Sequence, residues 1–155
     1  MTKTGHQKTS MATDQPARTL QRALDLKRSG IESIRRGVPI ALLVSSTECS
    51  YCERLKAEVF RPMLKHKPDA EKVALFELLI DVDDEVNDFD GNLRTGHAVA
   101  ESYDATLTPT VLFLAPDGTE LAERMIGVLN YDFYPWYFDQ RIEIATERLR
   151  HVINN

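Results

Sequence analysis

Two short apolar runs, at residues 38–44 and 73–80, constrain the fold of this chain most strongly. The first reads Val-Pro-Ile-Ala-Leu-Leu-Val and the second Val-Ala-Leu-Phe-Glu-Leu-Leu-Ile. Neither run alternates between apolar and polar residues, which is typical of strands buried on both faces of a parallel sheet. The segment between them carries apolar residues at helical spacing from about Ser50. A strand, a helix and a second strand in this order predict a right-handed parallel crossover, and therefore an α/β fold.

Apolar periodicity and turn residues predict the remaining elements. Helices are expected at about 17–36, from Ser50 with an interruption at Pro62, at about 95–104 and at about 132–153. Strands are expected at 110–114 and 120–128, joined by the turn Pro116-Asp-Gly118. The acidic segment 83–94 is interpreted as a solvent-exposed loop. The order α-β-α-β-α-β-β-α predicts a central mixed sheet of about four strands flanked by helices.

The composition excludes several classes of protein. No apolar run approaches the roughly 18 residues that cross a bilayer, so we expect no membrane span. The net charge is −5, from 19 basic and 24 acidic residues, which argues against nucleic-acid binding by bulk electrostatics. The first 15 residues are polar and lack the apolar core of a signal peptide. We expect residues 1–15 to be disordered and residues 16–155 to form one monomeric domain, periplasmic if a signal was trimmed and cytoplasmic otherwise.

The entire cysteine content is one C-x-x-C, formed by Cys49 and Cys52. Two cysteines are too few for a disulfide-stapled scaffold or a four-cysteine metal site. The pair follows the first buried strand and opens the next helix, whose N-terminal end favours a thiolate at Cys49. Cys52 lies one turn further and can resolve a mixed disulfide formed on Cys49. The pattern predicts a thiol–disulfide oxidoreductase that needs no metal and no organic cofactor.

Two other functions remain open at this point. Cys49 and Cys52 could form half of a zinc site, for which His66 and His97 are the candidate additional ligands. Alternatively, the domain could be a non-enzymatic binding or redox-sensing module. Partner binding that survives replacement of both cysteines would identify such a module, and metal analysis would identify a carrier.

An ordered set of motifs resembles the thioredoxin superfamily over roughly residues 38–150. These motifs are the strand Ile40–Val44, Cys49-Ser-Tyr-Cys52, Ile80-Asp-Val-Asp83, Ala100-Glu-Ser-Tyr103, Thr108-Pro109-Thr110, Val111-Leu-Phe-Leu114, Asp117-Gly118 and Ile126-Gly127. Within the superfamily, the chain is most similar to bacterial thioredoxin-like proteins related to the periplasmic sulfur-oxidation (Sox) thioredoxins. The resemblance implies a thioredoxin fold, protein disulfide or dithiol substrates, and a partner reductase or oxidase.

The same resemblance implies the remaining site residues. The Thr108–Pro109 bond is expected to be cis and to face the cysteines. The backbone of Thr108 would pair with an extended substrate peptide. Apart from the resemblance, Tyr51 lies between the two cysteines and would either line the substrate groove or cover the start of the helix. Pro109 completes the expected substrate-binding set.

Three positions depart from thioredoxin itself. Glu48 replaces the tryptophan that precedes the first cysteine, Ser50-Tyr51 replaces Gly-Pro, and Leu43 replaces a buried aspartate. Glu48 would raise the pKa of Cys49, against the effect of the helix end. Without the buried aspartate, the proton of Cys52 must pass to another group, such as Glu48 or Glu53, or to water. The direction of the redox reaction depends on a reduction potential that the sequence does not fix.

Overall fold

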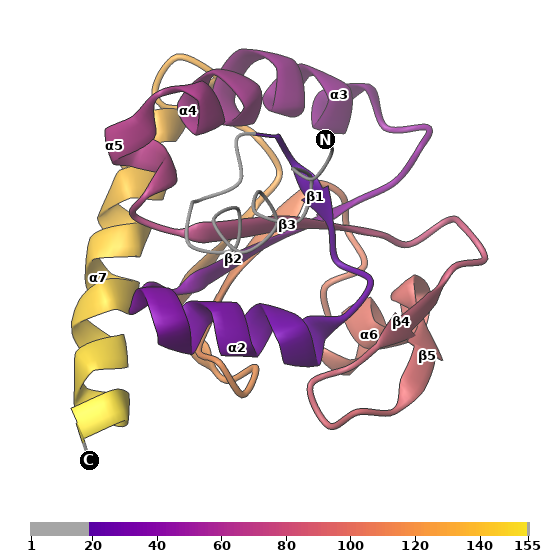
Figure 1. Cartoon of the computed structure of the whole chain (residues 1–155). Coiled ribbons are helices and arrows are strands. Elements are labelled where there is room, and N and C mark those ends of the chain that lie inside the picture. Colours follow the sequence, from indigo (N-terminus) through magenta and orange to yellow (C-terminus); the bar gives the residue numbers. More distant parts are fainter. Residues whose placement is uncertain (1–18, 155) are drawn as a thin grey trace, which may run out of the picture.

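The computed structural model of the chain describes residues 19–154 and centres on a five-stranded mixed sheet (Figure 1). Across the sheet the strand order is β1-β3-β2-β6-β7. The strands are β1 (Gln21–Arg22), β2 (Ile40–Ser45), β3 (Ala74–Leu79), β6 (Thr110–Leu114) and β7 (Glu120–Ile126). The predicted α/β class and mixed sheet are confirmed, with one edge strand more than the sequence indicated. The predicted disorder of residues 1–15 lies outside the described residues.

The central strands are buried on both faces, as their unbroken apolar runs predicted. Strand β2 pairs in parallel with β3 over six residue pairs, from Ile40↔Ala74 to Ser45↔Leu79. On its other side β2 pairs antiparallel with β6, with Val44 opposite Thr110. All six residues of β2 and all five of β6 are buried. Because β2 and β6 run in opposite directions, the carboxyl end of β2 and the amino end of β6 share one sheet edge.

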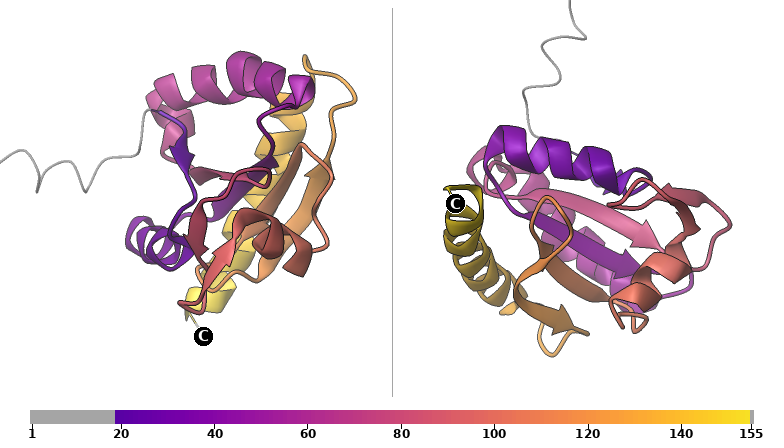
Figure 2. Two further views of the ribbon diagram at one scale, coloured as in Figure 1. Left: turned by 90° about the vertical axis from the view of Figure 1, so that its right-hand side faces the viewer. Right: turned by 90° about the horizontal axis from the view of Figure 1, so that it is seen from below.

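Helices cover both faces of the sheet (Figures 1 and 2). The helices are α2 (Leu26–Arg36), α3 (Ser50–Leu55), the π-helical turn η1 (Lys56–Phe60), α4 (Arg61–Lys65), α5 (Lys67–Ala70), α6 (Gly96–Ser102) and α7 (Tyr134–Asn154). Side chains of α3, η1, α4 and α7 pack in one hydrophobic cluster, and those of α2 and α6 pack in a second. Within residues 19–154, no helix has the length and apolar character required to cross a bilayer.

The predicted helix at 17–36 is wrong over its first part. Residues 21–22 form the edge strand β1, which pairs in parallel with β3. The helix begins only after Asp25, whose side chain accepts a hydrogen bond from the Arg28 backbone N–H and caps the first turn. Apolar spacing alone suggested an earlier start, but Ile31 and Ile34 are exposed and the buried face includes Ser29, Gly30 and Ser33. Gly30 lies against the Pro116 backbone, where a Cβ atom would have no room, which explains a small residue at this position.

Segment 83–94, expected to be a loop, contains most of a second, two-stranded sheet. Strand β4 (Glu85–Asn87) pairs antiparallel with β5 (Leu93–Thr95). Asp88 accepts backbone N–H groups of Asp90 and Asn92 at 2.9 Å each and closes the turn. Val86 is the buried residue of this hairpin. Because the two strands bury only this one side chain, the segment is as polar as a loop. The sequence pattern therefore did not reveal the hairpin.

The helix that carries the cysteines is interrupted, as Pro62 predicted. The π-helical turn η1 separates α3 from α4, and Pro62 occupies the first turn of α4, where a missing backbone N–H is tolerated. Phe60, from η1, packs its ring against Phe138 of α7, with centroids 5.3 Å apart. Phe138 also contacts Phe113 of β6 at 5.5 Å. This aromatic contact fixes α7 and the cysteine-bearing helix on the same face of the sheet.

Candidate functional site

Cys49 and Cys52 form a disulfide at the start of α3. Cys49 is the N-cap residue of this helix, and its Sγ accepts a hydrogen bond from the Cys52 backbone N–H at 3.1 Å. The two Cα atoms lie 5.2 Å apart, within the usual range for a disulfide. A helix N-terminus offers N–H donors to a thiolate as well as to a disulfide sulfur. The predicted position of the pair, between a buried strand and a helix, is confirmed.

The two sulfur-bearing residues differ in exposure. Cys52 is completely buried, whereas Cys49 is partly exposed. An external disulfide can therefore reach Cys49 but not Cys52, and the sulfur within reach of Cys52 is Cys49 Sγ. An attacking and a resolving cysteine require an asymmetry of this kind.

The loop before Cys49 is fixed to the end of β3 by a side-chain clamp. The Asp81 carboxylate accepts the Thr47 backbone N–H at 2.9 Å and the Thr47 hydroxyl at 2.6 Å. These hydrogen bonds from Thr47 hold the pKa of Asp81 below its ordinary value. Glu48, next to Cys49, is exposed to solvent. The clamp positions the cysteine loop relative to the parallel strand pair.

The Thr108–Pro109 peptide is cis, as the resemblance implied. Pro109 directly precedes β6, at the sheet edge where β2 leads into the cysteine loop, since Thr110 is opposite Val44. The Pro109 carbonyl accepts the Gly127 backbone N–H at 2.7 Å, which joins this segment to the end of β7. Pro109 is buried and Thr108 is half-buried. Topology thus brings Thr108, Pro109 and the cysteine loop to one edge of the sheet.

Tyr51 lies between the cysteines with its side chain 61% exposed. Its backbone carbonyl accepts a hydrogen bond from the Tyr131 hydroxyl at 3.4 Å. The Arg54 guanidinium stacks on the Tyr131 ring, 4.1 Å from the centroid. The segment before α7 therefore contacts the first turn of α3, and the Tyr51 side chain is left free to meet solvent or a partner.

A buried cluster of charged residues, which the sequence analysis did not predict, lies next to this turn. The Lys56 ammonium contacts carboxylates of Glu77 and Glu53 at 2.8 Å each. The Ser45 hydroxyl donates to the same Glu77 oxygen, Oε2, at 2.7 Å. The side chains of Lys56 and Glu77 are only 8% and 9% exposed. Burial by itself lowers the pKa of Lys56, but the hydrogen bonds and charges of Glu53 and Glu77 together raise it by more, so the pKa of Lys56 is raised. A sequence signal existed: Glu77 is the single charged residue in the apolar run 73–80.

The two candidate proton acceptors for Cys52, Glu48 and Glu53, have different surroundings. Glu53, though half exposed, is ion-paired with Lys56, and Glu48 has a solvent-exposed side chain. Leu43, which stands where thioredoxin has a buried aspartate, is opposite Glu77 in the β2–β3 register. Strand β3 therefore places the Glu77 carboxylate beside the position at which thioredoxin has its buried aspartate.

The histidines considered as metal ligands interact with nearby residues of their own segments. His66 Nδ1 lies 2.9 Å from Asp69 Oδ2, and His97 lies 3.8 Å from Glu101. In the part of the chain that the structure describes, no three His, Cys, Asp or Glu side chains are grouped so that they could hold a metal ion. The geometry therefore gives no support to a cysteine–histidine zinc site.

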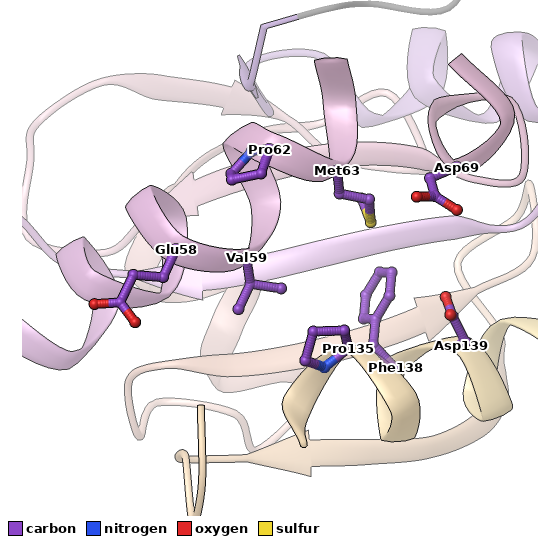
Figure 3. A pocket seen from close by; sticks show the side chains of 8 residues that line it. All are labelled: Glu58, Val59, Pro62, Met63, Asp69, Pro135, Phe138 and Asp139. Atoms are coloured by element: carbon purple, nitrogen blue, oxygen red, sulfur yellow. The ribbon is translucent and has the colours of Figure 1, made fainter. Parts of the chain in front are cut away.

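A separate cavity of about 250 Å³ lies where η1 and α4 meet the start of α7 (Figure 3). Its lining residues are Glu58, Val59, Pro62, Met63, Asp69, Pro135, Phe138 and Asp139. Neither cysteine lines it. The aromatic residues at the start of α7 divide here, since Tyr134 and Phe138 are buried while Phe133, Trp136 and Tyr137 are exposed. Two of these aromatic side chains thus pack in the core, and three face solvent.

Comparison with known proteins agrees with this geometry. The family model described as a thioredoxin-like domain matches residues 26–141. Thioredoxin O2 from Arabidopsis thaliana, in its oxidised state, aligns with a TM-score of 0.53 and 15% identity over 80% of this chain and 95% of its own. Thioredoxin from Fasciola hepatica aligns with a TM-score of 0.52 and 19% identity, over 79% of this chain and 99% of its own. The DsbH oxidoreductase aligns with a TM-score of 0.55 and 14% identity, over 83% of this chain and 85% of its own.

No curated protein matches this chain by sequence. The solved structures, all below 20% identity in these three cases, bear on the fold alone. The family match covers most of the chain and includes both cysteines and the Thr108–Pro109 segment. On this evidence, the chain belongs to the thioredoxin-like domain family.

Proposed function

We propose that this protein is a thiol–disulfide oxidoreductase that acts on protein disulfides through Cys49 and Cys52. The observation that carries the proposal is the disulfide between a partly exposed N-cap cysteine and a fully buried one. Such an arrangement supports nucleophilic attack from one sulfur and internal resolution by the other. Membership of the thioredoxin-like family supports the same chemistry.

The proposed reduction proceeds in two exchange steps. The Cys49 thiolate attacks one sulfur of a substrate disulfide, forms a mixed disulfide and releases the first substrate thiolate. Cys52 then loses its proton and attacks Cys49 Sγ, forming the Cys49–Cys52 bond and releasing the second substrate thiolate. Two electrons pass to the substrate; one substrate thiolate takes up the proton that Cys52 loses, and the other is protonated by water. A partner dithiol reductase restores the reduced pair, and the reverse sequence would oxidise a substrate dithiol.

Exposed apolar side chains around Cys49 suggest the substrate surface. Tyr51, Leu107 and Ile126 are 61%, 69% and 59% exposed. Ile126 pairs with Thr110 at the end of β7, and Leu107 precedes Thr108. An unfolded or extended protein segment could place apolar side chains on these residues while its backbone pairs with Thr108. We assign Tyr51, Thr108 and Pro109 to substrate binding on this basis.

Two cysteine variants test the proposal. Cys49→Ser should abolish reduction of insulin by a dithiol, because the nucleophile is lost. Cys52→Ser should leave Cys49 reactive and accumulate a mixed disulfide with the substrate, because resolution is lost. A matched variant, Ser50→Ala, changes the intervening dipeptide without removing a sulfur and should retain turnover. Turnover that persists in Cys49→Ser would overturn the proposal.

The direction of the reaction follows from one measurement. Equilibration with glutathione gives the reduction potential, and a value near that of reducing thioredoxins would indicate a reductase. A much more oxidising value would indicate disulfide formation. Partner binding that survives replacement of both cysteines, with no turnover in the parent protein, would instead identify a non-enzymatic binding module.

A further inference from the structure

The buried charges of Lys56 and Glu77 have no role in the exchange steps described above. Burial of an ion pair is unfavourable unless the charges are mutually satisfied, and here Lys56, Glu77 and Ser45 meet within 2.8 Å. Apolar residues of similar size at these positions would be neutral or favourable for stability. The position of the cluster next to the dithiol offers a reason for the charges.

Several contacts connect the cluster to Cys52. Lys56 follows Cys52 by four residues, and its backbone N–H donates to the Cys52 carbonyl, so the two side chains lie on one helical face. Glu53, directly after Cys52, is the second carboxylate bound to Lys56. Ser45, at the end of β2, leads into the cysteine loop and donates to Glu77. The cluster therefore spans the strand end and the helix turn between which the disulfide lies.

We propose that Lys56 and Glu77 are positioning residues that set the proton affinity of the buried Cys52 thiol, with opposite signs. The Lys56 ammonium stabilises the Cys52 thiolate, and the Glu77 carboxylate offsets that effect and keeps the lysine in place. This inference rests on the proposed function, because it concerns the cysteine that must lose a proton in the resolving step. Neither residue is expected to touch the substrate.

The other charged groups around Cys52 are few. On the same helix, Glu53 binds Lys56, and Arg54 is directed to Glu58 and the Tyr131 ring. Before the helix, Glu48 is exposed. Strand β2 brings Ser45, and the segment that leads into β6 brings Thr108, Pro109 and Thr110, none of which ionises at ordinary pH. Lys56 and Glu77 are thus the buried charges in this neighbourhood among the described residues.

The experiment uses a Cys49→Ser background, in which Cys52 is the single thiol of the chain. The ultraviolet absorbance of the thiolate is followed against pH as the difference from Cys49→Ser/Cys52→Ser, which has the same five tyrosines, and then reports the Cys52 pKa without any enzymatic assay. A buried unit charge about 10 Å away changes a proton affinity about tenfold. Lys56→Met should raise the proton affinity of Cys52 by about this factor, and Glu77→Gln should lower it by a similar factor.

The double variant Lys56→Met/Glu77→Gln supplies the decisive comparison. It removes one charge of each sign, so the Cys52 titration should return to within about threefold of the Cys49→Ser parent. It also leaves no unpaired buried ion, which favours folding if Lys56→Met alone is unstable. Arg150→Met is the matched control, because it breaks an exposed ion pair with Glu147 at 3.1 Å and should not move the titration.

Opposite shifts in the single variants, cancelled in the double variant, would support the proposal. Shifts of the same sign that accumulate in the double variant would indicate structural damage and overturn it. An unchanged titration in Glu77→Gln and in the double variant would also overturn it. Because the titration needs no turnover, these outcomes are independent of the insulin assay, in which failure would contradict the proposed function itself.

Discussion

Phe138 of α7 joins two other elements, η1 and strand β6, and its truncation should be the most damaging single change in the aromatic core. The side chain is 1% exposed and contacts Phe60 of η1 and Phe113 of β6 at ring-centroid distances of 5.3 Å and 5.5 Å. Phe→Ala substitutions in cores cost about 3–5 kcal/mol, which combines lost transfer free energy with a cavity. Each aromatic pair adds about 0.5–1.5 kcal/mol beyond buried area. We therefore expect Phe138→Ala to lose about 4 kcal/mol of unfolding free energy.

Phe133, five residues earlier, provides a matched control because its side chain is 61% exposed. Phe133→Ala should change the unfolding free energy by less than about 0.5 kcal/mol. Urea unfolding at 25 °C, followed by circular dichroism, measures both variants, and thermal unfolding should show a decrease of about 10 °C in Tm for Phe138→Ala. A loss below about 1 kcal/mol in Phe138→Ala, or equal losses in the two variants, would contradict the assignment of Phe138 to the core.

Three further changes test local features of the fold. Asp81→Asn should loosen the loop before Cys49 and speed alkylation of the reduced protein. Hydrogen bonds from Thr47 lower the Asp81 pKa. The stabilisation that they give the folded state is therefore complete above the unfolded-state pKa of Asp81 and disappears as pH falls through the lowered value. The difference in unfolding free energy between parent and variant should accordingly shrink in acid. Tyr103→Phe should cost about 1 kcal/mol in urea unfolding at neutral pH, because the hydroxyl donates to the Gly118 carbonyl. Burial raises the Tyr103 pKa to about 12, so that stabilisation should persist to the ordinary tyrosine pKa and be lost as pH rises towards 12. Gly37→Ala should lower the unfolding free energy by about 1 kcal/mol, because Gly37 ends α2 in the left-handed conformation at φ 67°. Chemical denaturation measures this loss, and an unchanged unfolding free energy would contradict the need for glycine.

Much of the candidate site could be predicted from the sequence because its signals are local. Cys49 and Cys52 lie between an apolar run and a helical pattern, and both neighbours formed as expected. Thr108-Pro109 directly precedes the strand 110–114, whose predicted bounds agree with the structure. A C-x-x-C or a Thr-Pro-Thr motif is readable because its residues are adjacent in the chain.

Other features required contacts between distant segments. Residues 21–22 form a strand only because the exposed edge of β3 is available to pair with them. The hairpin β4–β5 depends on a register between 85–87 and 93–95 that a polar composition does not reveal. The buried face of α2 also does not follow its apolar residues, since Ser29 and Ser33 pack inward and Ile31 is exposed.

The sequence by itself determined the fold class, the order of the central elements and the identity of the dithiol, since hydrophobic periodicity and adjacent motifs encode them. Only the tertiary structure decided which charges surround that dithiol. Glu77 and Lys56 are 21 residues apart in sequence, and Ser45 is 32 residues from Glu77. They meet because β2 pairs in parallel with β3 and the helix after β2 crosses over this face of the sheet. Electrostatic effects depend on distance in space, so the environment of Cys52 follows from strand register and helix packing.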